Sequence, residues 1–475
     1  MHERFQLCHW TLSNNSRMIR SLSFFLISVL LLTNSFGQGK QNKKLSTSLD
    51  ELIPKRLMAI APGCVVMVVK NDKVIYKKAF GTANTELNIP MQPDMHFRTG
   101  SMGKQYTAIA VLQLVEQGKI TLQDSIQKYI KDFPSKGYTI TIENLLTNTS
   151  GIKDYLSEIS NPSKEKESYT PKDGVDYIKD EHLNFKPGSN YRYSNSNFYL
   201  LGYIIEMVTG DTFENYLTKN VLDKAGLKNT FYIHPEKNIP DMPQGYSKFD
   251  GKIEKATLQD AAIMYSAGAL ISNADDIYKW HRALYNQRLV TNETLEKATT
   301  PFKFPDGTFS EYGYGWFIKN IDGSKTIEHS GSTDGFQSDE IYLPNENAFV
   351  VALYNCYEAD MDWQILTNDI ARLAIGKPLN NELKLNEDIL KQYAGIYAYD
   401  AKNKLIVTLE NGSLFVEDTN PDARLPKVQL YAKTENEFYM KEAPLRFEFV
   451  KDVNNSFKIV TYNNRGKDAE WTKTR

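Results

Sequence analysis

A serine and a lysine lie three positions apart, at Ser101 and Lys104, in the stretch from Phe97 to Gly118. Apolar residues recur along this stretch at the spacing of a helix, and Gly118 follows them as a typical helix stop. Residues three apart lie on one helix face, so the pattern places the lysine amine beside the serine hydroxyl. A lysine held there can activate the serine as a nucleophile, and free N–H groups at the helix start can stabilise the oxyanion of acyl transfer.

The same spacing also fits a serine that caps the helix and a lysine on its surface. Roughly two S-x-x-K matches are expected by chance in a chain of this length. Catalysis at this pair is therefore a hypothesis that depends on the other motifs of the chain.

Two further polar motifs lie outside this predicted helix. Y-S-N, from Tyr193 to Asn195, precedes an apolar helix that we predict over Tyr199 to Val208, and H-S-G, from His329 to Gly331, lies in a strand-like stretch. Taken singly, these residues could be a core tyrosine, a turn asparagine and a strand-edge serine. Side chains on loops beside rigid elements can also be aimed into a cleft.

The elements around the motifs predict an antiparallel sheet. From Gly63 the chain has two β-rich runs around an Asn-Asp-Lys turn, and more strands follow after Tyr312. Helical patterns separate these groups, one with a capped start at Ser272, whereas the polar residues 161–184 are predicted as a surface loop. This order indicates a sheet completed by distant segments, with a helical insertion.

The C-terminal part changes to short β runs after a polar join near residues 376–385. We predict about eight strands between Gly395 and Trp471, with Asn411-Gly412 as the strongest hairpin signal of the chain. Eight strands in roughly 90 residues suit a small antiparallel barrel or a sandwich.

Composition excludes several kinds of partner. Lys and Arg number 56 against 58 Asp and Glu, a formal net charge of -2 without a long run of one sign, so we expect no nucleic acid partner. The seven histidines and three cysteines show no metal-ligand spacing, and we predict no metal site and no cofactor. Cys64 and Cys356 lie in apolar strand-like runs, which favours buried free thiols over a disulfide.

The N-terminal region has the pattern of an export signal. Two arginines precede an apolar run from Leu22 to Leu32, and Ser35 and Gly37 follow with the spacing of a signal peptidase site. We therefore expect residues 1–37 to be an N-terminal extension and signal peptide, and the protein to be exported, periplasmic or secreted. The apolar run, about eleven residues, is short for a membrane span. An uncleaved signal anchor and a true start at Met18 instead of the first residue both stay open.

Together the three motifs resemble one family. S-x-x-K from Ser101, Y-S-N from Tyr193 and H-S-G from His329 have the order and approximate spacing of the serine β-lactamase and penicillin-binding protein superfamily. The tyrosine of the second motif resembles the class C β-lactamase branch, with its D-aminopeptidase, DD-carboxypeptidase and esterase relatives. L-L-T-N-T-S-G-I, Y-G-Y-G-W and H-S-G-S-T-D-G-F support the resemblance, although histidine is usual in the family at Asn148 and proline at Asp334.

The resemblance also implies a domain order. It covers roughly residues 50 to 375 and implies an α/β (α+β) fold of the β-lactamase/transpeptidase type over residues 45–376, with an antiparallel sheet flanked by helices. The predicted small antiparallel β-barrel over residues 385–475 resembles the lipocalin-like domain of some D-stereospecific peptidases in this branch. We therefore predict two folded domains after the export signal.

Transferred position by position, the resemblance makes Ser101 the nucleophile and Lys104 with Tyr193 the proton-transfer pair. Asn195 would hold the substrate amide or orient the lysine, and the backbone N–H groups of Ser101 and Ser332 would form the oxyanion hole. A tyrosine titrates at about 10 in ordinary surroundings, so Tyr193 can be the base only if positive charge stabilises its phenolate. Lys104 is the other candidate base, and the sequence leaves this choice open.

His329 departs from the β-lactamase pattern, in which lysine is usual. His329, Gly331 and Ser332 are expected to border the substrate. Histidine is mostly uncharged near neutral pH and gains charge as the pH falls, so its attraction for a β-lactam carboxylate should be weak at neutral pH and stronger in acid. This departure favours peptide or ester substrates over antibiotics.

The resulting hypothesis is an exported serine hydrolase that forms an acyl-enzyme on a D-amino-acid-containing peptide or an ester and resolves it with water. Its partner would be a small-molecule or peptide substrate, with cell-wall peptide as one candidate. A true β-lactamase and a non-hydrolytic sensor of penicillin or cell-wall peptide stay as alternatives, and the oligomeric state stays open.

Overall fold

The computed structural model of the chain forms two units, residues 1–52 and residues 53–475. Residues 42–57 are helical, and the predicted export signal lies outside the described residues. Within the part that is described, no helix is both long and apolar enough to cross a membrane. The structure describes residues 42–57, 61–156, 170–234, 239–249, 252–257, 261–358, 363–379, 383–419, 427–440, 445–452, 455–463 and 466–474.

A seven-stranded antiparallel sheet is the centre of the part of the chain that precedes the C-terminal β runs. Its strand order is β3-β2-β1-β12-β11-β10-β9, so β1 pairs both with its hairpin neighbour β2 and with β12 from far later in the chain. The predicted completion of the sheet by distant segments is confirmed. The strands are β1 (Gly63–Lys70), β2 (Lys73–Asn84), β3 (Ile89–Pro90), β9 (Phe317–Ile321), β10 (Ser324–Thr333), β11 (Phe336–Leu343) and β12 (Ala348–Tyr354).

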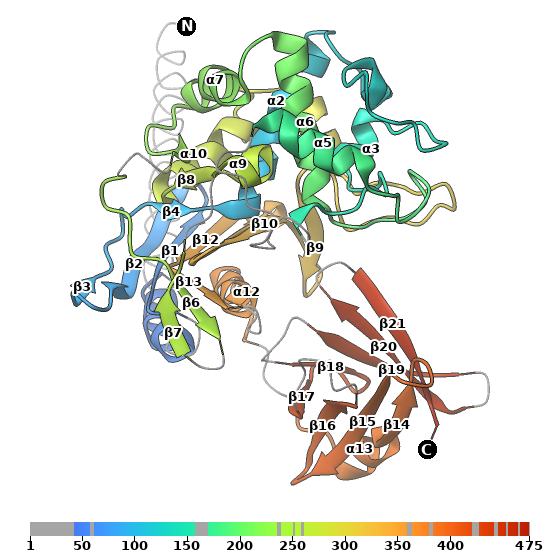
Figure 1. Cartoon of the computed structure of the whole chain (residues 1–475). Coiled ribbons are helices and arrows are strands. Elements are labelled where there is room, and N and C mark those ends of the chain that lie inside the picture. The colour runs from blue at the N-terminus through green and yellow to red at the C-terminus, as the bar shows by residue number, and fades with distance from the viewer. Residues whose placement is uncertain are drawn as a thin grey trace, which may run out of the picture. The chain divides into compact units, whose positions relative to one another are not determined.

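Helices cover both faces of this sheet (Figure 1). On one face α10 (Ala274–Tyr285) packs against β1 and β12, and on the other α12 (Trp363–Ala374) packs against β11 and β12. The helical insertion contributes α2 (Gly103–Glu116) and α6 (Asn195–Thr209), which pack together in a large apolar core. The elements of the predicted fold are thus present around the segment that carries Ser101.

Shorter elements complete this part of the chain. Two small three-stranded sheets are formed by β4 (Phe97–Arg98), β8 (Leu270–Ser272) and β5 (Phe231–Tyr232), and by β13 (Cys356–Glu358), β6 (Tyr246–Phe249) and β7 (Lys252–Lys255). The helical pieces are η1 (Gly100–Met102), η2 (Ile126–Lys128), α3 (Ile142–Leu146), α5 (Pro171–Asp180), α7 (Phe213–Leu217), η4 (Thr218–Leu222), α8 (Asp223–Ala225), α9 (Ala261–Met264), η5 (Tyr265–Ala267), α11 (Asn292–Ala298) and η6 (Pro344–Glu346).

The first hairpin and the state of the two described cysteines agree with the predictions. Asn71 and Asp72 join β1 to β2 with φ values of 50° and 61°. Positive φ at both central residues is typical of a two-residue hairpin turn, which matches the twist of the strands. Cys64 and Cys356 are buried free thiols.

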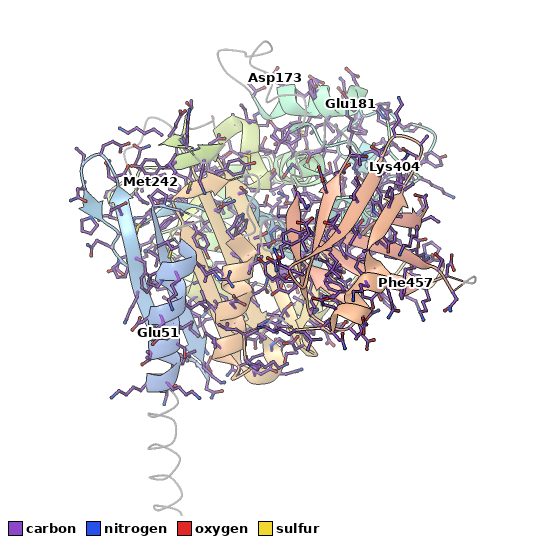
Figure 2. All side chains as sticks on the ribbon, turned by 90° about the horizontal axis from the view of Figure 1, so that it is seen from below. Glu51, Asp173, Glu181, Met242, Lys404 and Phe457 are labelled. Carbon is purple, nitrogen blue, oxygen red and sulfur yellow. The ribbon has the colours of Figure 1, made fainter. Side chains whose placement is uncertain are left out.

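The predicted loop over residues 161–184 is wrong for much of its described part, because α5 lies there. Thr170 and Asp173, the latter labelled in Figure 2, form a reciprocal capping box at the helix start. The helix buries only one narrow stripe of residues. Its polar composition therefore resembles a loop, whereas the capping box and the helical spacing of the few apolar residues specify a helix.

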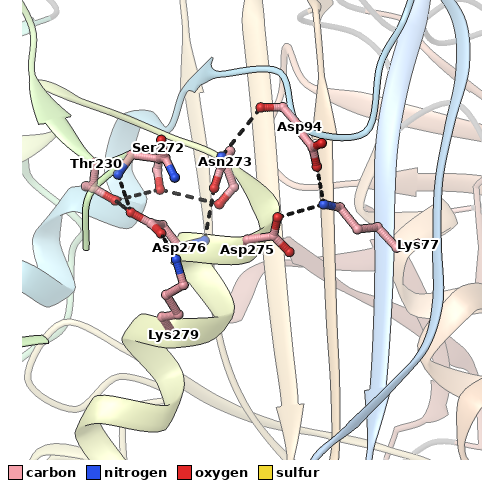
Figure 3. Close-up of polar contacts among 9 residues, drawn as sticks. Lys77, Asp94, Thr230, Ser272, Asn273, Asp275, Asp276 and Lys279 are labelled. Carbon is pink, nitrogen blue, oxygen red and sulfur yellow. Dashed lines mark hydrogen bonds and ion pairs between the residues drawn. The ribbon is translucent and has the colours of Figure 1, made fainter. Parts of the chain in front are cut away.

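The start of α10 lies one residue later than predicted. Asn273 caps the helix in place of Ser272, since its side-chain oxygen accepts a hydrogen bond from the Asp276 N–H at 3.0 Å. Beside this helix start Lys77 of β2 donates to Asp275 at 2.7 Å (Figure 3). This ion pair joins α10 to the sheet.

The C-terminal part is a closed antiparallel barrel of eight strands, which confirms the predicted barrel. Leu390 and Tyr393 of α13 (Glu387–Tyr393), a helix that was not predicted, belong to the same apolar cluster as the strand residues. Figure 2 labels Lys404 and Phe457, the first residues of β15 and β20. The strands are β14 (Gly395–Ala398), β15 (Lys404–Glu410), β16 (Ser413–Asp418), β17 (Val428–Ala432), β18 (Glu437–Tyr439), β19 (Arg446–Lys451), β20 (Phe457–Asn463) and β21 (Gly466–Lys473).

Candidate active site

Ser101 lies in the short 3₁₀ turn η1, which leads directly into α2. The α-helix starts at Gly103, so Ser101 lies just before it and not on its face as predicted. The chain still coils through this turn, so the predicted juxtaposition is present, with Lys104 Nζ 3.1 Å from Ser101 Oγ.

Lys104 is completely buried, which is unusual for a lysine. Its Nζ donates to Asn195 Oδ1 at 2.7 Å and to the backbone carbonyl oxygen of Ala267 at 2.8 Å. The centroid of the Tyr193 ring lies 4.9 Å from the same nitrogen. Burial lowers the pKa of Lys104 to about 7, although the charge of Asp154 acts to raise it. Near neutral pH a large share of the amine is therefore uncharged and able to accept a proton.

Asn195 connects Lys104 to a residue that the sequence reasoning missed. Asn195 is the first residue of α6, not part of the loop before it, and its Nδ2 donates to Asp154 Oδ2 at 2.9 Å. Ser101, Lys104, Asn195 and Asp154 thus form a continuous series of side-chain hydrogen bonds. The available sequence signal was position, since Asp154 is the second residue after the motif L-L-T-N-T-S-G-I.

The segment that carries Asp154 is fixed to the start of α6 by other side chains. Asn148 Oδ1 accepts from Asn197 Nδ2 at 2.8 Å, and Ser196 Oγ accepts from the Tyr155 N–H at 3.0 Å. Asn148, at the position where histidine is usual in the family, is completely buried. These contacts hold the segment and the helix start in one relative position.

Strand β10 lies directly against the turn that carries Ser101. A Cβ atom on Gly331 would come within 1.9 Å of the Thr99 carbonyl oxygen and 2.9 Å of the Ser101 nitrogen. A Cβ atom on Gly100 would come within 2.8 Å of the Ser332 nitrogen. Such close backbone approach requires glycine at both positions. The two N–H groups predicted to form the oxyanion hole therefore lie at the same contact between η1 and β10.

His329 is buried in β10, and both of its ring nitrogens have partners. Nε2 lies 3.0 Å from the Tyr312 hydroxyl, and Nδ1 lies 2.6 Å from the carbonyl oxygen of Ser330. Burial, together with the charge of Lys104, lowers the pKa of His329 to about 3. The expectation that His329 gains charge in mild acid is therefore wrong, because a water-excluded ring stays neutral there.

Aromatic rings surround the amine and the imidazole. The Tyr193 ring lies edge-on to Tyr312, with centroids 6.2 Å apart, and the Phe317 and His329 centroids are 5.3 Å apart. Tyr312 comes from the motif Y-G-Y-G-W, which supported the resemblance without an assigned role. These rings form apolar surroundings that help to account for the low pKa values.

A second group of buried polar side chains involves Gln105 of α2. Gln105 accepts a hydrogen bond from Trp280 Nε1 at 2.8 Å and donates its amide N–H to Glu340 Oε1. Burial raises the pKa of Glu340 to about 7, although the hydrogen bond from Gln105 acts to lower it. Glu340 lies opposite His329 in the β10–β11 pairing. The sequence signal for this group was a polar glutamine next to Lys104, in a helix predicted to be buried.

The assembled side chains are suited to nucleophilic acyl transfer. A serine hydroxyl, a lysine of lowered pKa and backbone N–H groups beside the serine are the parts that this chemistry needs. No three His, Cys, Asp or Glu side chains are grouped so that they could hold a metal ion, as far as the described residues extend.

Known proteins share this sequence pattern. The sequence model of the family described as Beta-lactamase matches residues 50–374. Penicillin-binding protein 4* of Bacillus subtilis (strain 168) is 24% identical over 463 residues, which are 92% of this chain and 100% of that protein.

Solved structures share the fold. The octameric penicillin-binding protein homologue from Pyrococcus abyssi is 25% identical, with a TM-score of 0.64, over 90% of this chain and 99% of that chain. A D-stereospecific amidohydrolase from Streptomyces sp. is 24% identical, with a TM-score of 0.57, over 65% of this chain and 94% of that chain. The family match covers more than half of the chain, including the motifs at Ser101, Tyr193 and His329. The chain therefore belongs to the beta-lactamase family and is a serine hydrolase with a β-lactamase/transpeptidase-like fold.

Proposed function

We propose that this hydrolase forms an acyl-enzyme on Ser101, with neutral Lys104 as the general base. The contacts of Lys104 carry the proposal. Asn195 Oδ1 and the Ala267 carbonyl oxygen can only accept hydrogen bonds, so they engage two N–H groups of the amine. An uncharged amine has two N–H groups and one lone pair, and that lone pair is left for the proton of Ser101 Oγ, 3.1 Å away.

The reaction then follows from these positions. Ser101 Oγ attacks the carbonyl carbon of the substrate while its proton passes to Lys104 Nζ, and the N–H groups of Ser101 and Ser332 donate to the oxyanion. Lys104 gives the proton to the departing amine or alcohol as the scissile bond breaks. Water next attacks the acyl group, which releases the acid and restores the Ser101 hydroxyl. Tyr193, whose ring lies over the same amine, is the second candidate to pass the proton to the leaving group.

We infer that the substrates are peptides that contain D-amino acids, or esters, in preference to β-lactams. The neutral imidazole of His329 supports this choice, since it provides no cation for a β-lactam carboxylate. The fold shared with a D-stereospecific amidohydrolase is consistent with it. We also propose export of the protein, on the N-terminal pattern of an apolar run followed by small residues.

A labelling experiment with a substrate panel tests this function. A fluorophosphonate should add one adduct to the wild-type protein, detected by intact mass and mapped to Ser101, and Ser101→Ala should abolish the adduct. D-aminoacyl amides or short-chain esters should be turned over faster than a chromogenic cephalosporin. An adduct mapped to another residue would overturn the assignment of Ser101. Faster turnover of the cephalosporin would identify a β-lactamase, and a burst without turnover on the whole panel would identify a sensor.

A further inference from the structure

We propose that Asp154 is a positioning residue for acylation, because its carboxylate fixes which end of the Asn195 amide faces Lys104. The inference rests on the proposed function and adds a residue that touches neither Ser101 nor the substrate carbonyl. Asp154 acts through Asn195, whose side chain lies between the carboxylate and the amine.

Both oxygens of Asp154 have donors. Oδ1 accepts from the Leu156 N–H at 3.1 Å, and Oδ2 accepts from Asn195 Nδ2 at 2.9 Å. A carboxylate only accepts hydrogen bonds, so the nitrogen of the Asn195 amide is the only end that can face it. The amide oxygen must then face Lys104, and this orientation is determined by chemistry.

The orientation of Asn195 decides where the lone pair of Lys104 points. With Asn195 Oδ1 facing Nζ, both N–H groups of the neutral amine have acceptors and the lone pair is left for Ser101. A reversed amide would present an N–H group to Nζ. That N–H would compete with the Ser101 hydroxyl for the lone pair, and the amine would lose an acceptor.

The charge of Asp154 has a separate effect. It raises the pKa of Lys104, against the larger effect of burial. The other titratable groups that face the amine are Tyr193, whose ring lies over it, and neutral His329 of β10, while η5 contributes only the Ala267 carbonyl oxygen. Asp154 is thus the carboxylate that opposes the desolvation of Lys104, so a change in its charge should move the acid limb of the rate profile.

Asp154→Asn separates these effects from simple packing. The new side chain has one oxygen in place of two, and when that oxygen accepts from the Leu156 N–H, its NH₂ group faces Asn195 and reverses the amide. We expect acylation by a small neutral ester to fall at least tenfold on the alkaline plateau. The acid limb should move to lower pH, because the negative charge is lost. Asp180→Asn, at the exposed end of α5, is the matched control and should change neither quantity.

The exchange Asp154→Asn/Asn195→Asp provides the decisive comparison. The NH₂ group of residue 154 would donate to the new carboxylate at 195, whose other oxygen would accept from Lys104, so each hydrogen bond is restored with the charge moved next to the amine. We expect faster plateau acylation than in Asp154→Asn and an acid limb at higher pH than in wild type. A purely structural role of Asp154 would not move the limb in opposite directions in the two variants.

Two results would overturn the role of Asp154. One is an Asp154→Asn variant with the wild-type plateau rate and acid limb. The other is a folded exchange variant whose acid limb stays at the wild-type pH, which decides the matter even if Asp154→Asn does not fold. Thermal unfolding of each variant monitors folding. Failure of wild-type Ser101 to be labelled would instead contradict the proposed function, so the two failures are distinguishable.

Discussion

Lys104 makes its two shortest hydrogen bonds to oxygens that only accept, which leaves the lone pair of the neutral amine for Ser101. Acylation should therefore depend on the pH at which the amine loses its proton. The pKa of the amine is lowered to about 7, mainly by burial. With a neutral ester as substrate, the acylation rate should therefore rise about tenfold per pH unit below pH 7 and level off above it. Stopped-flow acylation between about pH 5 and 9 measures this limb.

The variant Lys104→Arg is the control for the charge at this position. A guanidinium stays protonated throughout the range, so the variant has a permanent positive charge and cannot act as a base, whereas Lys104 is mostly neutral at pH 8. We expect acylation at pH 8 to fall by about 100-fold or more, the usual contribution of general base catalysis. An Arg variant that acylates at the wild-type rate would assign the base to Tyr193 instead.

Glu340 leads to a prediction about stability at the same scale. Burial raises its pKa from 4.5 to about 7, so between these values the folded protein holds a proton that the unfolded chain has lost. The stability of the folded state should therefore fall as the pH rises through this window, by about 3 kcal/mol when the full shift is realised. Glu340→Gln removes the titration. Its unfolding temperature relative to wild type should be higher at pH 8 than at pH 4.5, and an equal difference at both values would contradict the buried-acid interpretation.

Residues in motifs could be predicted, whereas their surroundings could not. Ser101 and Lys104 are within hydrogen-bonding distance because local helical coiling alone brings them together. Asp154 and Glu340 reach Asn195 and Gln105 through tertiary packing, and the sequence signals for them, the end of a motif and a lone glutamine, do not specify those contacts. The neutrality of His329 in mild acid could not be predicted either, since it depends on burial.

At the scale of elements, the contact between β10 and η1 specifies glycine at position 331. Gly331→Ala would place a methyl group 1.9 Å from the Thr99 carbonyl oxygen and 2.9 Å from the Ser101 nitrogen. The strand must then move away from the turn, which separates the two oxyanion donors. We expect acylation to slow by about 100-fold or more, comparable to the loss of one oxyanion donor.

A variant at the end of the same strand controls for general damage to β10. Thr333→Ala shortens a half-buried side chain at the last residue of β10 and should leave acylation within about twofold of wild type, because the backbone contact at Gly331 is unchanged. Both variants are compared by acylation with the neutral ester and by thermal unfolding. Near-normal acylation in Gly331→Ala would show that acylation does not depend on the close contact between the backbones at Ser101 and Ser332.

The order of strands and helices was predictable because periodicity and turn residues are local. Alternation and turn signals located the barrel strands, and the first hairpin has its turn at Asn71 and Asp72. The helix α5 was not predicted because its polar composition is typical of a loop, and its capping box is a weaker signal than composition. Ser272 and Asn273 are adjacent, and serine and asparagine cap helices about equally well. Ser272 is the last residue of β8, so Asn273 caps α10 instead.

At the scale of the whole molecule, the apolar cores are assigned to separate stretches of sequence. Among the described residues, every member of the barrel's core cluster comes from residue 385 onward. The clusters around the catalytic segment, including the one that contains Phe336 and Leu353, end before α12. Each stretch has its own apolar core, which is the usual requirement for an independent domain.

The two stretches should therefore fold independently. A protein ending at Gly376, just after α12, keeps every strand of the seven-stranded sheet and should stay soluble, react with a fluorophosphonate and hydrolyse a short ester at close to the full-length rate. Residues 383–475 alone should give a cooperative thermal transition, because α13 and all eight barrel strands are retained.

The rates of the shortened protein on short esters and on longer peptides then test whether the barrel contributes to catalysis. A loss of rate confined to peptides would mean that the barrel contributes to substrate binding. Aggregation of the shortened hydrolase together with an unfolded barrel fragment would show instead that both stretches form one cooperative unit.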